Sequence, residues 1–214
     1  MKRDKIKVHL LWDDDRSCEH IEHCRYAGTD CSVMHRNMVW PSIPSGKFIF
    51  GCATGAQPEY MKALLGVVPY HFPAILRGYE LGVQEYNDIP KPVRKILDNN
   101  WPKGEFKSYY VRESSDSDNE ILGVAWFMRH EQIAVIDDWE FEGLWFDRNP
   151  VELVLKDGSR LLSGMDTYIL KPQYRGHVIR SDLANKKPYL VEKKKFLELA
   201  RKNNLFARRA RGEK

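Results

Sequence analysis

The sequence predicts an α+β fold in which a strongly twisted, partly closed mixed β-barrel is flanked by a few helices. Two observations predict this class. Segments that alternate like strands outnumber segments with helical periodicity, and turns of hairpin type join most of the strands. Strands that follow one another through short turns form a continuous sheet, which twists and begins to close, while the few helices pack against it.

The chain divides into three parts. Residues 1–45 form an N-terminal extension with no clear periodicity beyond a possible strand at residues 6–12, and a cluster of proline and glycine marks its end. Residues 46–170 carry the main domain, which resembles a family described below. Residues 171–214 form a basic, helical C-terminal extension.

The domain begins with a strand, a glycine turn and a helix. Residues 47–50 form a short apolar run that ends at Gly51, which predicts a buried strand followed by a tight turn. Residues 58–65 predict a short helix, because proline is tolerated in the first turn. Two further segments follow: a strand interrupted by glycines at residues 74–83, and a helix at residues 89–97 with Asp88 as its N-cap.

Two hairpins and a helix complete the domain. Residues 105–112 and 120–128 alternate and are rich in aromatic and β-branched residues, so the polar link between them predicts a hairpin with a solvated loop. Residues 131–139 show helical spacing, which places Glu140 at or just past the end of the inward face. The last two strands, residues 151–155 and 160–170, flank an Asp-Gly pair that is a strong turn signal.

The net charge of +4 hides a segregation of charge along the chain. Residues 171–214 contain 14 Lys and Arg and four Asp and Glu, a net charge of +10, whereas residues 1–170 carry −6. A helix is expected at about residues 188–206, and a cationic segment extends from Lys193 to Arg211. It could bind nucleic acid or another acidic partner, but aromatic residues are few, so a packed terminal helix with a solvated basic face is favoured.

No membrane, metal or cofactor is expected. No stretch approaches the ~18 apolar residues of a membrane span, and the apolar run at residues 8–11 is too short for a signal peptide, so a cytoplasmic location is expected. A zinc site near the N-terminus is conceivable, but its spacing lacks the short C-x2-C knuckle, which favours free thiols beside surface histidines. The side chains in question are Cys18, His20, His23, Cys24, Cys31 and His35.

Four segments, in this order, resemble the gamma-glutamyl cyclotransferase-like family and in particular its gamma-glutamylamine cyclotransferase-like branch. The first resembles the family's strand and its Tyr-Gly-x-Leu or Tyr-Gly-Ser-Asn turn, and the last resembles a Leu-Asp-x-x-Glu helix end followed by an aromatic-x-Arg and a hairpin. The segments are Phe48-Ile49-Phe50-Gly51-Cys52-Ala53, Pro73-Ala74-Ile75-Leu76-Arg77-Gly78-Tyr79, Gly123-Val124-Ala125-Trp126, and Ile136-Asp137-Asp138-Trp139-Glu140 with Phe146-Asp147-Arg148.

The resemblance implies an enzyme that releases 5-oxoproline and a free amine from a gamma-glutamyl amine or amide. The substrate's own α-amine attacks its γ-carbonyl, so neither a metal nor an organic cofactor is implied. Glu140 is implied as the general acid/base. The implied substrate-binding residues are Phe50, Gly51, Cys52, Ala53, Phe146 and Tyr168.

The chemistry of these residues agrees with those roles. Glu140 lies between Trp139 and Phe141, and burial among such apolar groups would raise the pKa of its carboxyl toward neutrality. The backbone N–H groups around Gly51 are suited to a developing oxyanion, because glycine lets a ligand approach the chain closely. The alternative is an ordinary solvated Glu140 in an acidic surface cluster with Asp137.

Departures from the family pattern support a second hypothesis. Phe50 lacks the hydroxyl of the family's tyrosine, Cys52 and Ala53 replace the usual pair after the glycine, and Phe146 replaces another tyrosine. A nucleophilic Cys52 would need an adjacent base that the sequence does not identify. The alternative function is therefore a catalytically inactive member of the fold that acts as a binding or regulatory protein.

Overall fold

A computed structural model describes residues 46–156 and 161–210, which belong to one compact unit, Ser45–Lys214. Three predictions fall outside the described residues: the strand at residues 6–12, the Cys/His cluster of the N-terminal extension and the Asp157-Gly158 turn. The segment after Leu170 belongs to the same unit as the domain, because strand β8 pairs with β3 and helix α7 packs on α3.

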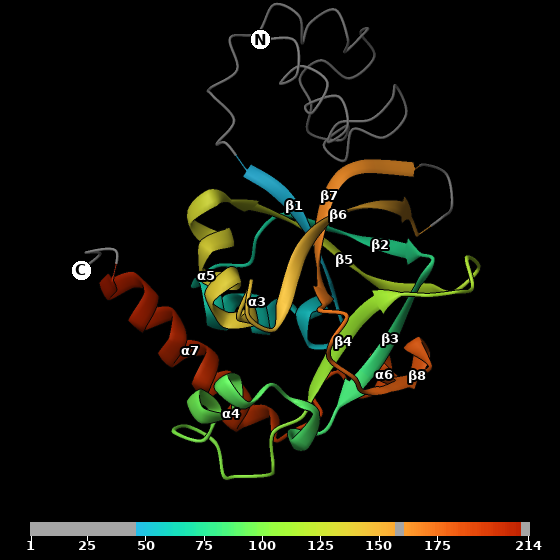
Figure 1. The fold of residues 1–214 in the computed structure, drawn as a ribbon. Coiled ribbons are helices and arrows are strands. Elements are labelled where there is room, and N and C mark those ends of the chain that lie inside the picture. Colours follow the sequence, from blue (N-terminus) through green and yellow to red (C-terminus); the bar gives the residue numbers. More distant parts are fainter. Residues whose placement is uncertain (1–45, 157–160, 211–214) are drawn as a thin grey trace, which may run out of the picture. The chain divides into compact units, whose positions relative to one another are not determined.

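One mixed sheet of eight strands organises this unit (Figure 1). Five strands, β1, β5, β2, β6 and β7, form a ring that is closed by the parallel pairing of β1 with β7 at Ile49 and Asp166. The predicted α+β class with a twisted, partly closed sheet is therefore confirmed. The strands are β1 (Gly46–Cys52), β2 (His71–Arg77), β3 (Tyr79–Gln84), β4 (Ser108–Glu113), β5 (Glu120–Arg129), β6 (Phe146–Leu155), β7 (Leu161–Leu170) and β8 (His177–Ile179).

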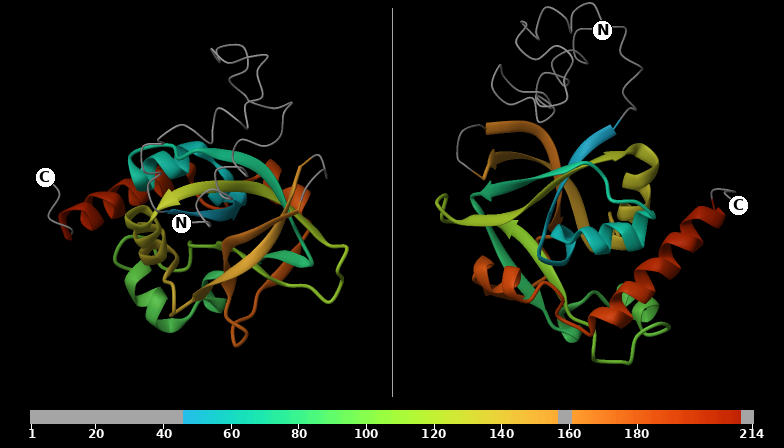
Figure 2. Two further views of the ribbon diagram at one scale, coloured as in Figure 1. Left: turned by 90° about the horizontal axis from the view of Figure 1, so that it is seen from above. Right: turned by 180° about the vertical axis from the view of Figure 1, so that it is seen from behind.

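Helices α3, α5 and α7 lie together, with α7 beside α3 in both Figure 1 and Figure 2, whereas α6 lies beside β8. Among the described residues no helix is long and apolar enough to cross a membrane. The helical elements are η1 (Ala53–Ala56), α3 (Pro58–Leu65), η2 (Tyr86–Asp88), α4 (Lys91–Leu97), α5 (His130–Glu140), α6 (Ser181–Lys186) and α7 (Lys193–Ala210), where η marks a 3-10 helix.

Two predicted helices begin later than expected, and each has a local reason. Asp88 does not cap α4, because its side chain accepts a hydrogen bond from the Glu85 backbone N–H at 3.2 Å and closes η2 instead. Pro90 then stands at the N-cap of α4. The C-terminal helix α7 begins at Lys193 rather than Pro188, because the segment between them is held by other parts of the unit. The predicted bounds of α3 are confirmed.

The predicted hairpin of residues 105–112 and 120–128 is wrong. Both strands exist as β4 and β5, but β4 pairs with β3, and β5 pairs with β2. The single strand predicted at residues 74–83 divides into β2 and β3 at Gly78, whose φ of +74° turns the chain. Because the two halves diverge there, each takes one strand of the expected hairpin as its partner, and the link between β4 and β5 spans the bend.

The core fills the space between the ring and the helices. Trp126 on β5 is fully buried, as are Leu64 on α3 and Met128 on β5. The C-terminal helix contributes as well, since Phe196 is 7% exposed and lies within 6.5 Å, centroid to centroid, of several core aromatic rings. Burial of α7 against this core positions its residues around the cavity described next.

Candidate active site

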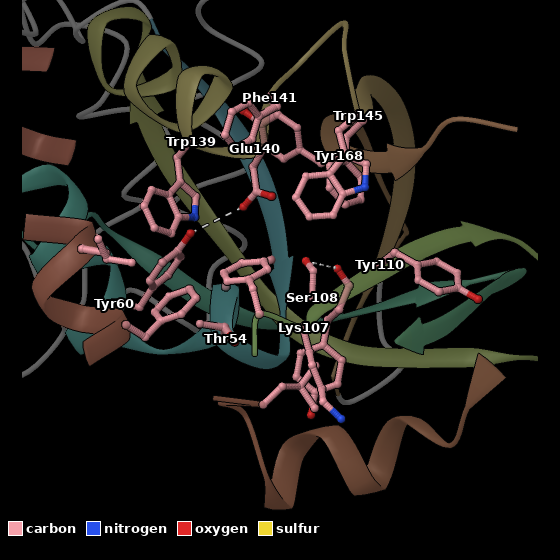
Figure 3. A pocket seen from close by; sticks show the side chains of 18 of the residues that line it. Thr54, Tyr60, Lys107, Ser108, Tyr110, Trp139, Glu140, Phe141, Trp145 and Tyr168 are labelled. Carbon is pink, nitrogen blue, oxygen red and sulfur yellow. Dashed lines mark hydrogen bonds between the residues drawn. The ribbon is translucent and has the colours of Figure 1, made fainter. Parts of the chain in front are cut away.

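A cavity of about 490 Å³ lies where β1 and α5 end, a volume typical of small-molecule sites. The ends of β4, β6 and β7 complete one part of its lining, and α4 with the segment leading into α7 completes the other. Figure 3 shows the carboxyl of Glu140 pointing from the end of α5 into this space, close to the rings of Trp139 and Tyr168. Gly51 and Cys52, at the end of β1, line the same cavity.

The helix ends directly after Glu140 because of a left-handed residue. Phe141 has φ +53° and ψ +48°, and the Glu142 backbone N–H donates to the Asp137 carbonyl at 2.9 Å. These features close the last turn of a helix. Glu140 is therefore the last helical residue, and its side chain projects from the helix end into the cavity.

Partial burial changes the acidity of Glu140. Burial in the cavity wall disfavours the charged form and raises the pKa of its carboxyl to about 7. The Tyr60 hydroxyl, 3.5 Å from Glu140 Oε1, donates a hydrogen bond that lowers the same pKa. Near neutral pH the group is therefore present both as carboxylate and as carboxylic acid, as proton exchange in both directions requires.

Close backbone contact makes glycine necessary at position 51. A Cβ on Gly51 would lie 2.5 Å from the carbonyl oxygen of Gly55, which no real side chain tolerates. That carbonyl is held in turn by the Trp126 indole N–H at 2.9 Å. The chain after β1 therefore folds back on itself and presents Gly51 and Cys52 to the cavity.

Backbone strain accompanies both sides of the site. Among the described residues, the two non-glycine residues with positive φ are Ala53, at +48°, and Phe141, at +53°. Each directly follows a cavity-lining residue, Cys52 and Glu140 respectively. A left-handed conformation costs a non-glycine residue roughly 1–2 kcal/mol, and such strain is concentrated at functional sites in proteins.

Cys52 has the electrostatics of a neutral thiol. Burial, followed by the charge of Glu140, raises the pKa of this thiol to about 12. A thiol with so high a pKa supplies almost no thiolate at physiological pH. This agrees with the sequence-based view that a nucleophilic role for Cys52 is not favoured.

An ion-pair network fixes α5 against the ring. Arg148 on β6 donates to Asp137 at 2.9 Å and to Asp166 on β7 at 2.8 Å. The Tyr168 hydroxyl also donates to Asp137, at 2.7 Å. Burial, the hydrogen bond to Asp137 and the nearby negative charges raise the pKa of Tyr168, so its hydroxyl stays neutral. Arg148 thus has the structural ion-pair role, while the Tyr168 side chain reaches the cavity.

Hydrogen bonds hold the chain between β8 and α7 beside the cavity. Thr54 in η1 donates to the Pro188 carbonyl, and the Tyr109 hydroxyl donates to the Lys187 carbonyl at 2.5 Å. The Tyr189 hydroxyl donates to Glu59 at 3.3 Å. These contacts hold the next residues, Leu190 and Val191, in the cavity lining, and α7 adds Phe196, Leu199, Lys202 and Asn203.

Six of the seven predicted site residues line this cavity together, with Ala53 as the exception. Ala53 is fully buried, and its left-handed backbone forms the turn beneath the site. Sequence reasoning missed Tyr60 and the whole contribution of the C-terminal segment. Tyr60 shares the buried face of α3 with Leu64, so helical spacing marks it as a core residue and gives no sign of its contact with Glu140.

No metal site was found among the described residues, where no group of three or more His, Cys, Asp or Glu side chains could hold an ion. Comparison by sequence gave no result: neither a family model nor a curated protein matches the chain.

Comparison by structure gave matches at low identity. A gamma-glutamyl cyclotransferase matches with a TM-score of 0.48 and 13% identity, covering 79% of this chain and 89% of its own. A protein from Arabidopsis thaliana, known from its solution structure, matches with a TM-score of 0.45 and 19% identity, covering 82% of this chain and 92% of its own. A gamma-glutamyl cyclotransferase specific to glutathione, from yeast, matches with a TM-score of 0.43 and 13% identity, covering 76% of this chain and 97% of its own.

Proposed function

We propose that the protein is a cyclotransferase that converts a gamma-glutamyl amine or amide into 5-oxoproline and a free amine, with Glu140 as general acid/base. The observation that carries the proposal is the meeting of two predicted motifs in one cavity. Glu140 and the Gly51 turn are about ninety residues apart in sequence, yet both line the same space, and burial raises the pKa of Glu140 to about 7.

The reaction needs little from the protein beyond positioning and proton transfer. The substrate's α-amine forms a bond to its own γ-carbonyl carbon, which closes a five-membered ring and produces a tetrahedral intermediate. As the carboxylate, Glu140 takes a proton from the attacking amine. As the acid, it returns that proton to the leaving amine while the carbon–nitrogen bond breaks, so no water is consumed.

The turn after β1 would stabilise the negative charge on the carbonyl oxygen during this step. Gly51 and Cys52 line the cavity. Backbone N–H groups of this turn would act as the donors, because preorganised donors aimed at a developing oxyanion contribute strongly. Phe50, Phe146 and Tyr168 would contact the glutamyl group. The hydroxyl that Phe50 lacks would then be replaced by contacts from the backbone.

The test measures 5-oxoproline released from a panel of gamma-glutamyl amines by wild type, Glu140→Gln and Glu142→Gln. Glutamine keeps the size of the side chain but cannot exchange a proton, so kcat/KM should fall by about 10²–10⁴ in Glu140→Gln. Glu142 is exposed and lies outside the cavity lining, so its variant should match wild type. Equal turnover by all three proteins would remove Glu140 from the mechanism.

The alternative proposal is a binding or regulatory protein that contacts nucleic acid or an acidic partner through its basic tail. Three tail lysines already have acidic neighbours within the unit, which makes this alternative the weaker one. Lys193 lies 2.6 Å from Glu59, Lys202 lies 3.1 Å from Glu198, and Lys195 lies 3.9 Å from Glu105. Tight RNA or DNA binding that weakens steeply with salt, with no 5-oxoproline from any substrate, would favour it.

A further inference from the structure

One wall of the cavity carries no part of the proposed catalytic machinery. We call it the C-terminal wall, and it consists of residues from α4 and from the segment 190–203. Apolar side chains dominate it, and they are Ile96, Leu97, Leu190, Val191, Phe196 and Leu199. Apolar walls with a few placed polar groups are typical of sites that bind the bulky part of a ligand.

This wall is fixed before any ligand arrives. The hydrogen bonds from Thr54 and Tyr109 to the backbone at Pro188 and Lys187 hold its first part in place. Its second part belongs to α7, whose Phe196 and Ala200 are buried in the core. A preformed wall loses little entropy on binding, so its shape can select among ligands.

One polar atom near this wall lacks a partner. The side-chain Nδ2 of Asn203 is buried without a hydrogen bond to any described residue, and Asn203 lines the cavity. A buried donor without an acceptor is unfavourable, and a ligand acceptor would relieve that cost. Lys107 and Lys202 line the same cavity, each beside a glutamate, at 2.9 Å from Glu85 and 3.1 Å from Glu198. An unpaired donor in a cavity that two lysines also line suits an anionic acceptor such as a carboxylate.

We infer that the amine portion of the substrate is a large apolar amino acid, whose side chain packs on the C-terminal wall and whose carboxylate accepts a hydrogen bond from Asn203. This inference rests on the proposed function. The glutamyl group would then lie beside Glu140 and the Gly51 turn, and the rest of the cavity would accept leucine, phenylalanine or a similar residue.

The first experiment compares substrates on the full-length protein. We expect kcat/KM for gamma-glutamyl-leucine and gamma-glutamyl-phenylalanine to exceed that for gamma-glutamyl-alanine and gamma-glutamyl-glycine by tenfold or more, because each additional buried methylene favours binding. Leu199→Ala should lower the leucine-to-alanine ratio by about tenfold. The matched control is Leu205→Ala on the same helix, since Leu205 is 54% exposed and lies outside the lining. Val191→Ala provides a second test if Leu199→Ala does not fold.

The second experiment tests the carboxylate. Gamma-glutamyl-leucine is compared with gamma-glutamyl-3-methylbutylamine, which has the same apolar group but no carboxylate. Wild type should favour the leucine compound by about tenfold, the value of a hydrogen bond to a charged group. Asn203→Ala should abolish that difference, and equal rates in wild type would overturn this contact.

The outcomes separate the two proposals. Release of 5-oxoproline from gamma-glutamyl-alanine with no preference for the large apolar compounds overturns the inference and leaves the proposed function standing. No 5-oxoproline from any of the five compounds overturns both.

Discussion

The two sides of the cavity differ in origin and in chemistry. One side, which we call the motif wall, comes from the ends of β1, α5 and β7 and carries Glu140, Gly51, Cys52 and Tyr168. It is strained, because a left-handed residue follows both Cys52 and Glu140. The C-terminal wall is mostly apolar and is held by hydrogen bonds to its backbone, and its lysine, Lys202, is paired with Glu198.

Under the proposed function, the comparison assigns chemistry and selectivity to different segments of this chain. The motif wall can perform proton transfer but has little surface left to distinguish one amine from another. The C-terminal wall has surface for recognition, and the proposed mechanism uses none of its side chains for proton transfer. Changes in the motif wall should therefore alter rate, pH dependence or stability, and changes in the C-terminal wall should alter substrate preference.

The largest effect on stability is expected from Glu140→Gln, which tests the electrostatics of the motif wall. Folding raises the pKa of Glu140 from its ordinary value of 4.5 to about 7, so between these values the folded state binds more protons than the unfolded state. Stability is therefore lost as pH rises from about 4.5 to about 7. Glu140→Gln removes this loss and should be more stable than wild type at pH 8, by about 1–3 kcal/mol, given that each pKa unit corresponds to ~1.4 kcal/mol.

Urea denaturation of both proteins at pH 5 and pH 8 measures this difference. The stability advantage of the variant should shrink toward zero at pH 5. At that pH the Glu140 carboxyl is mostly protonated in the folded protein, so burial of its charged form costs little stability. Leu205→Ala, on the exposed side of α7, should show no such dependence on pH. An advantage that stays constant with pH would mean that Glu140 is not held in a low-dielectric setting.

A smaller effect tests the geometry of the same wall. Gly51→Ala places a Cβ 2.5 Å from the Gly55 carbonyl oxygen, so the turn must move, and stability should fall by about 2 kcal/mol. Gly55→Ala is the matched control, because a Cβ there meets no atom within 4 Å and should change stability by less than about 0.5 kcal/mol. Equal unfolding midpoints for both variants would contradict the close packing of this turn.

The sequence predicted the motif wall far better than the C-terminal wall, and the reason is physical. A strand that runs into Gly51 and a helix that ends at Glu140 are local patterns, which one short window reveals. Leu199 shows only that α7 has an apolar stripe, and a stripe does not identify its partner. What α7 covers depends on contacts such as that between Thr54 and Pro188, 134 residues apart, which no local pattern encodes.

The predicted hairpin failed for a similar reason. Alternation identified β4 and β5 correctly as strands, and nearness in sequence then indicated that they pair with each other. The bend at Gly78 decides otherwise, because it divides one long strand into two halves that require different partners. Glycine at that position was visible in the sequence, but its left-handed conformation depends on the complete sheet.

The smallest expected effect concerns Tyr60, which contacts Glu140 but was not among the predicted site residues. Its hydroxyl donates to Glu140 at 3.5 Å and lowers the pKa of that carboxyl, so Tyr60→Phe should raise the pKa. The acid limb of the kcat/KM profile, which reports ionisation of the free enzyme's base, should then move to higher pH by a few tenths of a unit. Tyr189→Phe is the control, because its hydroxyl bonds Glu59 instead. No shift in Tyr60→Phe, or an equal shift in both variants, would show that Tyr60 supports the fold without tuning Glu140.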